Sequence, residues 1–482
     1  MVRKLSISGM TKGEKAGEIT TSEHTAGPDF RIVMIMPHSW RGGMLKVGIE
    51  TCNLLEGLEV NGRRVRTSFA VPTGYSLKSI VGLKPGIPVL HTCFDVVESD
   101  DLRVLDKIDA THYPLHPHNP LTFSYPNDPS GAILSADGWI LMTGLLPFGP
   151  ILPIKPYAVY APDFIQRYVP QIFPEDITDF VWQMSASQNM TMQAAREVFA
   201  TTPKTVSDIT VYGGVPKSRV SLFPLFHSAE TGRTGGAHMK SKALPLQPDS
   251  ELQSLPTFEE TAATISGAGH AFAPNLLKRD YFLWVTNSTQ HKNHINALEA
   301  LDIYYNELGG ALDCYICGPT TQLFTDVQNT IPYIQGIASK LQILSRSSQK
   351  IMILGELPAV RFDTVLSNAR FLWHNVLYDN GTFSVLEAAE LDVPAVVSDY
   401  TKMRFICETY GVEPEWFFAK DARGAAQALL TQEQKGNVGA TTSAPVALEQ
   451  ELKTCLKNLV QGLMRESKTL INQPVLTALK IN

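Results

Sequence analysis

Short apolar runs alternate with helix-like segments along most of this chain, and that alternation limits the folds open to it. Residues 31–37 form one such run, RIVMIMP, and a glycine turn separates it from a helical pattern at residues 44–62. A short run that is apolar throughout is typical of a parallel strand buried on both faces. The same order returns from Tyr281 onward, where five apolar runs are separated by helical segments. The alternation predicts parallel sheets with helices on both faces.

The chain has 482 residues, more than one hydrophobic core usually organises. We therefore expect an α/β fold of two facing Rossmann-like domains, with ligands bound in the cleft between them, beyond the carboxyl ends of the strands. The expected parts are a flexible tail at residues 1–29, an N-terminal domain at 30–227, a linker or insert at 228–279, a C-terminal domain at 280–460, and a C-terminal helix at 461–482 that could cross back to the first domain. In the N-terminal domain, residues 177–190 and 191–214 are predicted to be helical.

Composition excludes several classes of function. The formal net charge of -6 argues against a general nucleic-acid binder, which needs a basic face. Six cysteines are thinly spread, so the sequence shows no disulfide framework and suits a reducing cytosol. Cys314 and Cys317 form a single C-x-x-C inside an apolar run, and we interpret them as buried strand residues and not as metal ligands.

The sequence predicts no membrane span. The first 29 residues lack the apolar core of a signal peptide or anchor. The longest apolar stretch, residues 139–154, is interrupted by Pro147, Pro150 and Pro153. We interpret it as a buried strand followed by a proline-rich loop, with contact to lipid or to a lipid-linked acceptor as the alternative.

Three segments of the second half carry residues suited to binding an anion and hydroxyl groups. Lys292 lies in a polar loop between a predicted strand and a helix, where a cation can meet an anion held by the helix N-terminus. Gly355 directly follows another strand and would let the backbone approach a flat ring. In the third segment, Asp379 and Glu387 flank a turn of Asn380, Gly381 and Thr382 that opens a helix.

In this order, the three segments resemble the donor domain of family 4 retaining glycosyltransferases, which have the GT-B fold of two Rossmann-like domains. The resemblance covers residues 281–408. His291-Lys292-Asn293 stands where the family has Arg-Lys-Asn, and Asp379 and Glu387 stand at the family's two glutamates, with seven residues between them. The shorter Asp379 and the histidine in place of arginine are the two departures from the family's pattern.

The resemblance implies a role for each matching residue. Lys292 would bind the donor diphosphate, Glu387 the ribose hydroxyls, and Asp379 would sit beside the sugar as a catalytic residue. The base would lie against the backbone of Glu356 and Leu357. Sugar or phosphate oxygens would be held at the turn, by Asn380 and the backbone of Gly381, Thr382 and Phe383.

The N-terminal half matches the family less closely. Gly42 and Gly43 correspond to its glycine pair, which lets the backbone approach the donor phosphate and the acceptor. Trp40 and Arg41 lie beside that turn as acceptor-side candidates, together with His116 and His118. Many members have His-Asp after a late strand, where this chain has Pro-Asp, so Asp163 is the second catalytic candidate.

The resemblance implies transfer of a hexose, with retention, from a GDP- or UDP-linked sugar to a glycan or lipid-linked acceptor in polysaccharide biosynthesis. We expect no metal and no other cofactor, since no D-x-D motif follows a strand. The expected location of the protein is the cytoplasm. The alternative is that it binds peripherally at the inner face of the membrane. Two alternatives remain open: a non-catalytic subunit that binds a nucleotide-sugar, and a related GT-B sugar-nucleotide epimerase or phosphorylase.

Overall fold

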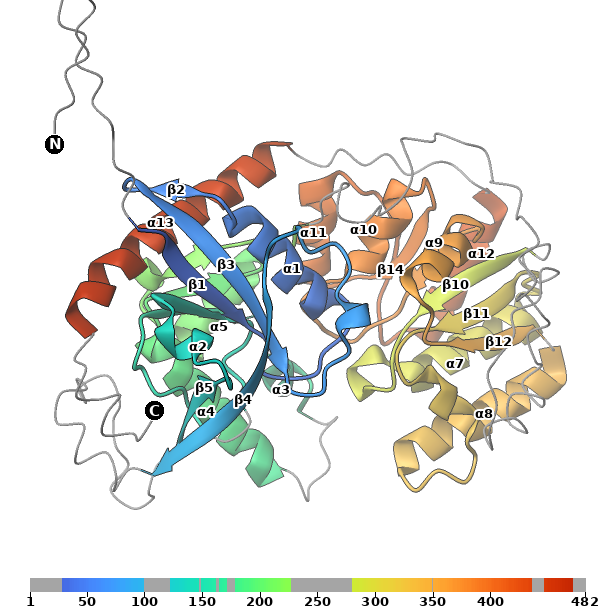
Figure 1. Ribbon diagram of the computed structural model, residues 1–482. Helices are drawn as coiled ribbons and strands as arrows, with labels where there is room; N and C mark the ends of the chain where they lie inside the picture. The colour runs from blue at the N-terminus through green and yellow to red at the C-terminus, as the bar shows by residue number, and fades with distance from the viewer. Residues whose placement is uncertain are drawn as a thin grey trace, which may run out of the picture.

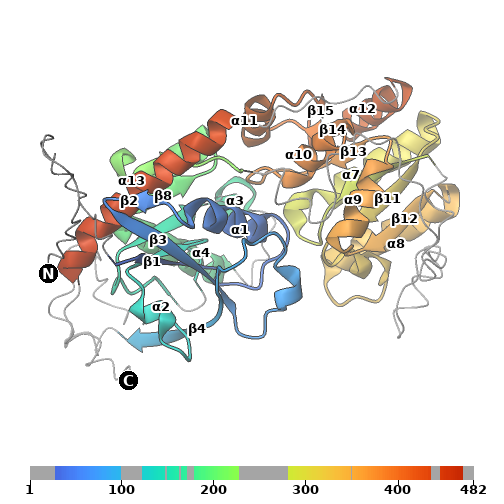
Figure 2. The ribbon, with the colours of Figure 1, turned by 45° about the horizontal axis from the view of Figure 1, so that its top comes forward.

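The computed structural model describes residues 28–98, 122–146, 149–161, 164–170, 178–226, 280–348, 350–435 and 446–470. Two parallel sheets, each covered by helices, form two domains that lie side by side (Figures 1 and 2). The predicted fold class, α/β with two facing Rossmann-like domains, is confirmed. The predicted tail lies almost entirely outside the described residues, and the predicted linker at 228–279 lies wholly outside them.

The N-terminal sheet is parallel along most of its width. Its order is β5-β4-β3-β1-β6-β7-β8-β9, in which β4 and β5 are antiparallel, and β2 pairs antiparallel with β3. The strands are β1 (Phe30–Ile35), β2 (Glu59–Val60), β3 (Arg63–Pro72), β4 (Val89–Glu98), β5 (Thr122–Asn127), β6 (Gly138–Leu141), β7 (Tyr157–Ala161), β8 (Glu197–Ala200) and β9 (Val220–Leu222).

Strand β1 shows why the apolar runs become central strands. Ile32 and Met34 belong to the hydrophobic cluster on one face of the sheet, whereas Val33 and Ile35 belong to the cluster on the other. Both faces of β1 are therefore buried, which fits a run without polar alternation. The helices around this sheet are α1 (Gly43–Leu55), η1 (Leu77–Ser79), α2 (Ala132–Ser135), α3 (Ile165–Tyr168), α4 (Thr178–Ala194), α5 (Pro203–Val211) and η6 (Lys217–Arg219).

The helical prediction for residues 191–214 is wrong in its middle. The segment Glu197–Ala200 forms β8, which pairs in parallel with β7 and β9. Val198, Phe199 and Ala200 are buried there. Between β7 and β9 this segment forms backbone hydrogen bonds to two neighbouring strands and buries its apolar side chains. These tertiary interactions outweigh its local helical pattern.

The C-terminal sheet is fully parallel across its described strands, in the order β12-β11-β10-β13-β14-β15. Its direction of winding reverses at β10, so the switch point lies between β10 and β13. The strands are β10 (Tyr281–Val285), β11 (Asp313–Cys317), β12 (Ile351–Gly355), β13 (Leu372–His374), β14 (Ala395–Ser398) and β15 (Glu415–Phe417). Cys314 and Cys317 are buried in β11, as predicted.

Helices pack on both faces of the C-terminal sheet (Figure 1). They are η8 (Gln290–Lys292), α7 (His294–Asp302), the π-helical segment η9 (Ile303–Glu307), η10 (Thr321–Thr325), α8 (Pro332–Ser348), α9 (Ala359–Ser367), α10 (Phe383–Glu390), α11 (Thr401–Tyr410) and α12 (Ala422–Lys435). None of the described helices combines the length and the apolar character that a membrane crossing would need.

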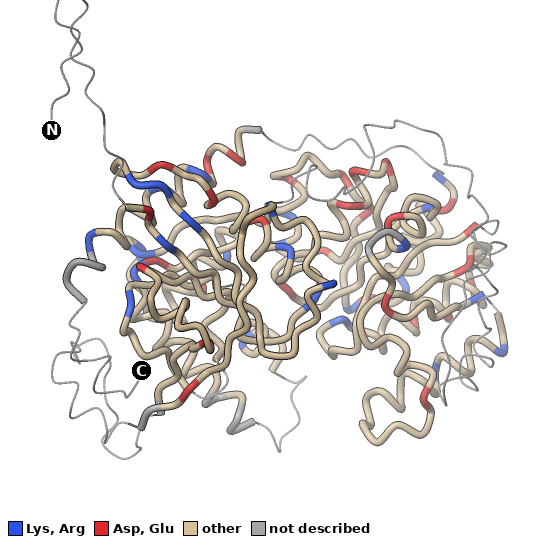
Figure 3. Tube along the Cα trace, viewed as in Figure 1, with Lys and Arg blue, Asp and Glu red and all other residues tan. Residues whose placement is uncertain are grey.

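The last described helix, α13 (Val446–Leu470), returns to the N-terminal domain, where it packs against α1 and β2 (Figure 2). It begins at Val446, before the predicted helix start at residue 461. Basic and acidic residues are spread over both domains and not collected on one side in the view of Figure 3.

Candidate active site

The polar loops that follow β10 and β13 bring Lys292 and Asp379 together. Lys292 ends η8, just after β10, and Asp379 lies in the turn after β13. The Lys292 Nζ donates to Asp379 Oδ2 at 2.8 Å, and the exposed fractions of the two side chains are 16% and 8%. In parallel α/β sheets, the switch point is where loops diverge and ligands bind. Two predicted site residues thus meet at the place in the fold where a ligand is expected.

Asp379 is held by hydrogen bonds on both carboxylate oxygens. Its Oδ1 accepts from the backbone N–H of Gly381 at 2.7 Å and from the hydroxyl of Tyr400. Burial alone would raise the pKa of Asp379, but the Lys292 ammonium and these hydrogen bonds outweigh it and hold that pKa below its usual range. Asp379 is therefore a charged carboxylate at neutral pH.

Sequence reasoning missed Tyr400, although a signal for it existed. Tyr400 follows β14, which neighbours β13 in the sheet, so its side chain starts from the same edge as Asp379. Burial and the adjacent carboxylate raise the pKa of Tyr400 well above its ordinary value. The phenol therefore keeps its proton and acts as a donor to Asp379.

Two histidines beside this ion pair are neutral. His374, the last residue of β13, is 2% exposed, and its Nε2 lies 3.9 Å from Asp379 Oδ2. Burial lowers the pKa of His374 to about 4. Burial, with the Lys292 charge as a smaller cause, lowers the pKa of His291 to about 3. His291 thus adds no charge at neutral pH, and Lys292 supplies the positive charge of this loop.

The turn between Asp379 and α10 is fixed by its own contacts. Gly381 has a φ of 90°, and a Cβ there would lie 1.9 Å from Ile406 Cδ1, so only glycine fits. The Thr382 hydroxyl accepts from the Ser384 N–H at 3.3 Å and caps α10. Asn380 Oδ1 accepts from the hydroxyl of Thr201 in the N-terminal domain. Asn380 and Gly381 therefore have structural contacts in this turn, beside any role in binding.

The glycine turn of the N-terminal domain faces the start of α10. Gly42 has a φ of 65° and a ψ of -130°, a conformation open mainly to glycine, and it precedes α1. A Cβ on Gly43 would lie 3.4 Å from the Phe383 ring. The first turns of α1 and α10 therefore abut across the domain interface.

At this interface, two ion pairs connect residues beside the glycine turn to predicted site residues of the C-terminal domain. Arg41 Nη1 lies 2.8 Å from Glu356 Oε2, and both side chains are exposed. Lys46, one turn into α1, pairs with Glu387 of α10, whose side chain is 12% exposed. The sequence placed Lys46 beside the glycine turn without a role, and in the structure it contacts the carboxylate that the resemblance assigns to the ribose.

The remaining predicted site residues either make ordinary structural contacts or lie outside the described residues. Trp40 is half-buried, and its carbonyl accepts from the Tyr75 hydroxyl at 2.8 Å. Leu357 packs against the hydrophobic cluster that joins the two domains. Asp163, His116 and His118 lie outside the described residues.

Aromatic contacts form a second part of the domain interface. The rings of Tyr168 and Tyr378 are stacked with their centroids 4.2 Å apart. The Tyr168 hydroxyl donates to Asp208 at 2.5 Å, and the Tyr378 hydroxyl donates to the same carboxylate at 3.5 Å. Tyr378 directly precedes Asp379, so this seam anchors the turn that carries the candidate site.

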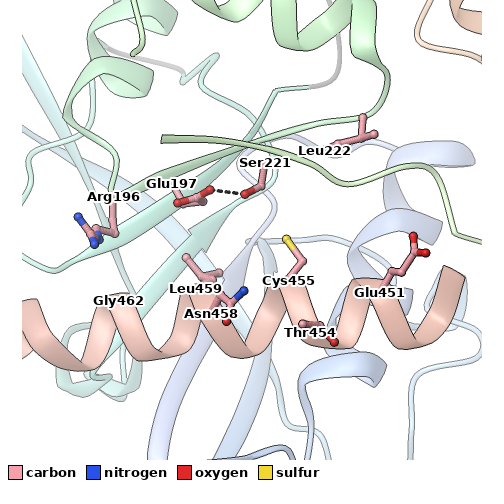
Figure 4. A pocket seen from close by; sticks show the side chains of 10 residues that line it. All are labelled: Arg196, Glu197, Ser221, Leu222, Glu451, Thr454, Cys455, Asn458, Leu459 and Gly462. Atoms are coloured by element: carbon pink, nitrogen blue, oxygen red, sulfur yellow. Dashed lines mark hydrogen bonds between the residues drawn. The ribbon is translucent and has the colours of Figure 1, made fainter. Parts of the chain in front are cut away.

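A separate cavity lies away from the domain interface. It has a volume of about 350 Å³ and opens between the β8–β9 edge and α13 (Figure 4). Within it, the Ser221 hydroxyl donates to Glu197. Its lining contains none of the predicted site residues: it consists of Arg196, Glu197, Ser221, Leu222, Glu451, Thr454, Cys455, Asn458, Leu459 and Gly462. In the part of the chain that the structure describes, no group of three or more His, Cys, Asp or Glu side chains could hold a metal ion.

Comparison with known proteins finds likeness in structure and not in sequence. No family model matches the chain, and no curated protein matches it by sequence. A glycosyltransferase from Rickettsia africae ESF-5 is similar at 9% identity and a TM-score of 0.48, over 94% of this chain and 100% of that chain. HepE from Anabaena, in complex with UDP and glucose, is similar at 10% identity and a TM-score of 0.47, over 92% and 99%. WaaG, a glycosyltransferase involved in lipopolysaccharide biosynthesis, is similar at 12% identity and a TM-score of 0.46, over 93% and 98%.

Proposed function

We propose that this chain is a glycosyltransferase that takes a nucleotide-diphosphate sugar at the interface of its two domains. One observation carries the proposal: Lys292 meets Asp379 at the switch point of the C-terminal sheet, next to the turn that opens α10. The glycine turn before α1 faces the same helix start from the other domain. A cation and a helix N-terminus at one switch point suit an anionic leaving group.

In this proposal, Lys292 and the first turn of α10 stabilise the departing diphosphate. The bond between the anomeric carbon and the phosphate oxygen breaks, and its electron pair stays on that oxygen. The acceptor hydroxyl forms the new bond to the same carbon and gives its proton to the departing phosphate. Donors placed where charge develops, in a site shielded from water, contribute most to such a step.

The remaining residues of the resemblance complete the proposal. Glu387 would accept from the ribose hydroxyls, and the backbone at Glu356 and Leu357 would hold a uracil or guanine base. Asp379 already accepts from three groups, so it would fix Lys292 and the turn as well as contact the sugar. A hexose would move with retention, without a metal, to a glycan or lipid-linked acceptor in polysaccharide biosynthesis.

A second candidate is a non-catalytic subunit that binds a nucleotide-sugar. The neutral His291 favours it, because the loop offers one charge fewer to a diphosphate than an arginine would. Binding needs less stabilisation of developing charge than turnover does.

Release of nucleoside diphosphate separates these candidates. The purified full chain is incubated with UDP-glucose, UDP-galactose, GDP-mannose or ADP-glucose, and both the release and the thermal shift are measured. We expect release from one donor, and its loss in Lys292→Met and Glu387→Ala. Lys453→Met is the matched control, because Lys453 pairs with Glu449 on the distant α13. A thermal shift without release supports the binding subunit, and release unchanged in Lys292→Met refutes the proposed site.

A further inference from the structure

We propose that Lys46 of the N-terminal domain is a ligand of the donor diphosphate and that Glu387 holds it in place until the donor binds. This inference rests on the proposed function and deepens it. It adds a phosphate contact from the opposite domain and makes the two domains share one anionic ligand.

The position of Lys46 supports the inference. Its backbone N–H donates to the Gly42 carbonyl at 3.0 Å, so Lys46 belongs to the first turn of α1, beside the glycine turn. Its ammonium contacts Glu387 on the facing helix α10. The ammonium is thus already at the interface where the proposed donor would lie, and the Lys46 side chain is 42% exposed.

In the proposed complex, Lys46 and the ribose hydroxyls would share the Glu387 carboxylate. Its side chain is 12% exposed, and one oxygen is taken by Lys46. The ribose hydroxyls would compete with the ammonium for the lone pairs of this carboxylate, so we expect donor binding to draw the ammonium away from Glu387. Burial lowers the pKa of the Lys46 ammonium even with the carboxylates of Asp363, Glu390 and Glu50 nearby, so a close anion stabilises its charge. A diphosphate placed nearby would give it a new anionic partner.

The exchange keeps each charge matched. Before binding, Lys46 is paired with Glu387. After binding, Lys46 is paired with the diphosphate, and Glu387 accepts from hydroxyl groups. A nucleoside without phosphates also displaces Lys46 from Glu387 but offers it no anion, so the lysine should hinder nucleosides and favour nucleoside diphosphates.

The second interdomain pair, Arg41 with Glu356, is a weaker candidate for the same role. Its side chains are 53% and 40% exposed, and surface pairs of this kind contribute little. The Lys46–Glu387 pair is the one whose carboxylate is largely buried. Of the two interdomain pairs, Lys46–Glu387 should therefore contribute more to the effect of the phosphates on affinity.

Calorimetric titration of the full chain tests the inference. UDP, GDP and ADP and the matching nucleosides are titrated into wild type, Lys46→Met and Lys46→Arg. We expect Lys46→Met to weaken the bound diphosphate roughly tenfold to a hundredfold, as for a lost charged hydrogen bond. The matching nucleoside should bind Lys46→Met equally well or more tightly. Lys46→Arg, which keeps the charge, should retain most of the affinity for the diphosphate.

Lys435→Met is the matched control, because Lys435 forms an ion pair with Glu415 elsewhere on the C-terminal domain. It should leave both affinities unchanged. Equal diphosphate affinity in wild type and Lys46→Met would overturn the inference and leave the proposed function standing. An equal loss for nucleoside and diphosphate would also overturn it, because Lys46 would then act only on the shape of the site. A wild-type chain that binds none of the nucleotides would overturn the proposed function as well.

Discussion

Lys292 and Asp379 are separated by 87 residues in the sequence, yet the Lys292 Nζ lies 2.8 Å from Asp379 Oδ2. The pair exists because β10 and β13 are neighbours in the sheet, and each residue lies in the loop that leaves one of them. The pair is largely buried, so each charge depends on the other. Its energetics can therefore be tested apart from any activity.

Replacing Lys292 by Met should destabilise the fold by about 3 kcal/mol, because the buried Asp379 carboxylate loses its cation. The double variant Lys292→Met/Asp379→Asn should regain part of this loss, since it leaves no unpaired charge. Urea unfolding of the two single variants and the double variant measures the coupling. Strictly additive losses would show that the two side chains do not interact.

Gly381→Ala should destabilise the chain by about 2–4 kcal/mol, because a Cβ strains a backbone at φ 90° and overlaps Ile406. The control is Gly336→Ala in α8, where a Cβ meets no atom within 4 Å. That change should stabilise the chain by about 0.5–1 kcal/mol, because alanine favours a helix. Thermal unfolding compares the two, and equal effects would contradict the geometry of the turn.

Thr201→Val should weaken the contact between the domains. It removes the hydroxyl that donates to the buried Asn380 Oδ1, and an unsatisfied buried acceptor costs about 1–3 kcal/mol. Thr454→Val, on the surface of α13, removes a hydroxyl with no interdomain contact and serves as the control. Denaturant unfolding should separate the variants, and the control should change by less than about 0.5 kcal/mol.

Stability should fall as the pH is lowered from 6.5 towards 4. Burial lowers the folded-state pKa of His291 and His294 to about 3 and that of His374 to about 4, from 6.5. Between these values the unfolded chain binds protons that the folded chain does not, so lower pH favours unfolding. Each histidine contributes up to about 1.4 kcal/mol per pH unit in this window.

Urea unfolding at pH 6.5 and pH 4.5 measures this dependence, and His374→Gln should reduce it. Asp379 contributes in a more acidic range. Its pKa is lower in the folded chain than in the unfolded chain, so its ionised carboxylate stabilises the fold at pH values above the unfolded-state pKa. This contribution is lost only as the pH falls towards the folded-state pKa. A stability that stays constant or rises on acidification to pH 4.5 would contradict neutral, buried imidazoles.

The sequence was sufficient to predict most strands of the two sheets, though not β2, β5 and β15, and to place Lys292 near Asp379. Apolar runs such as β1 are buried on both faces, so their pattern is strong, and parallel topology sends their following loops to one edge. The short strand β8 escaped prediction because four residues carry too little pattern beside two helices. Its conformation is decided by its neighbours in the sheet.

Partners across the domain interface could not be predicted from the sequence. Lys46 reaches Glu387 because α1 and α10, which are far apart along the chain, pack against each other. No local pattern encodes that Lys46, the single lysine of α1, faces α10. The same holds for Asn380, whose side chain bonds to Thr201 of the other domain.

The route of α13 has a consequence for biosynthesis. Leu456, Val460 and Leu463 of this helix are fully buried in the same hydrophobic cluster as α1 and β1. A Cβ on Gly138 would lie 3.3 Å from Leu463, so the helix also reaches the start of β6. The N-terminal domain therefore leaves the ribosome with one side of its core uncovered, and that side stays uncovered until α13, at residues 446–470, has been translated. Domains usually fold in the order in which they emerge from the ribosome. Here the N-terminal domain, which is translated first, completes its core only after the C-terminal domain has been translated.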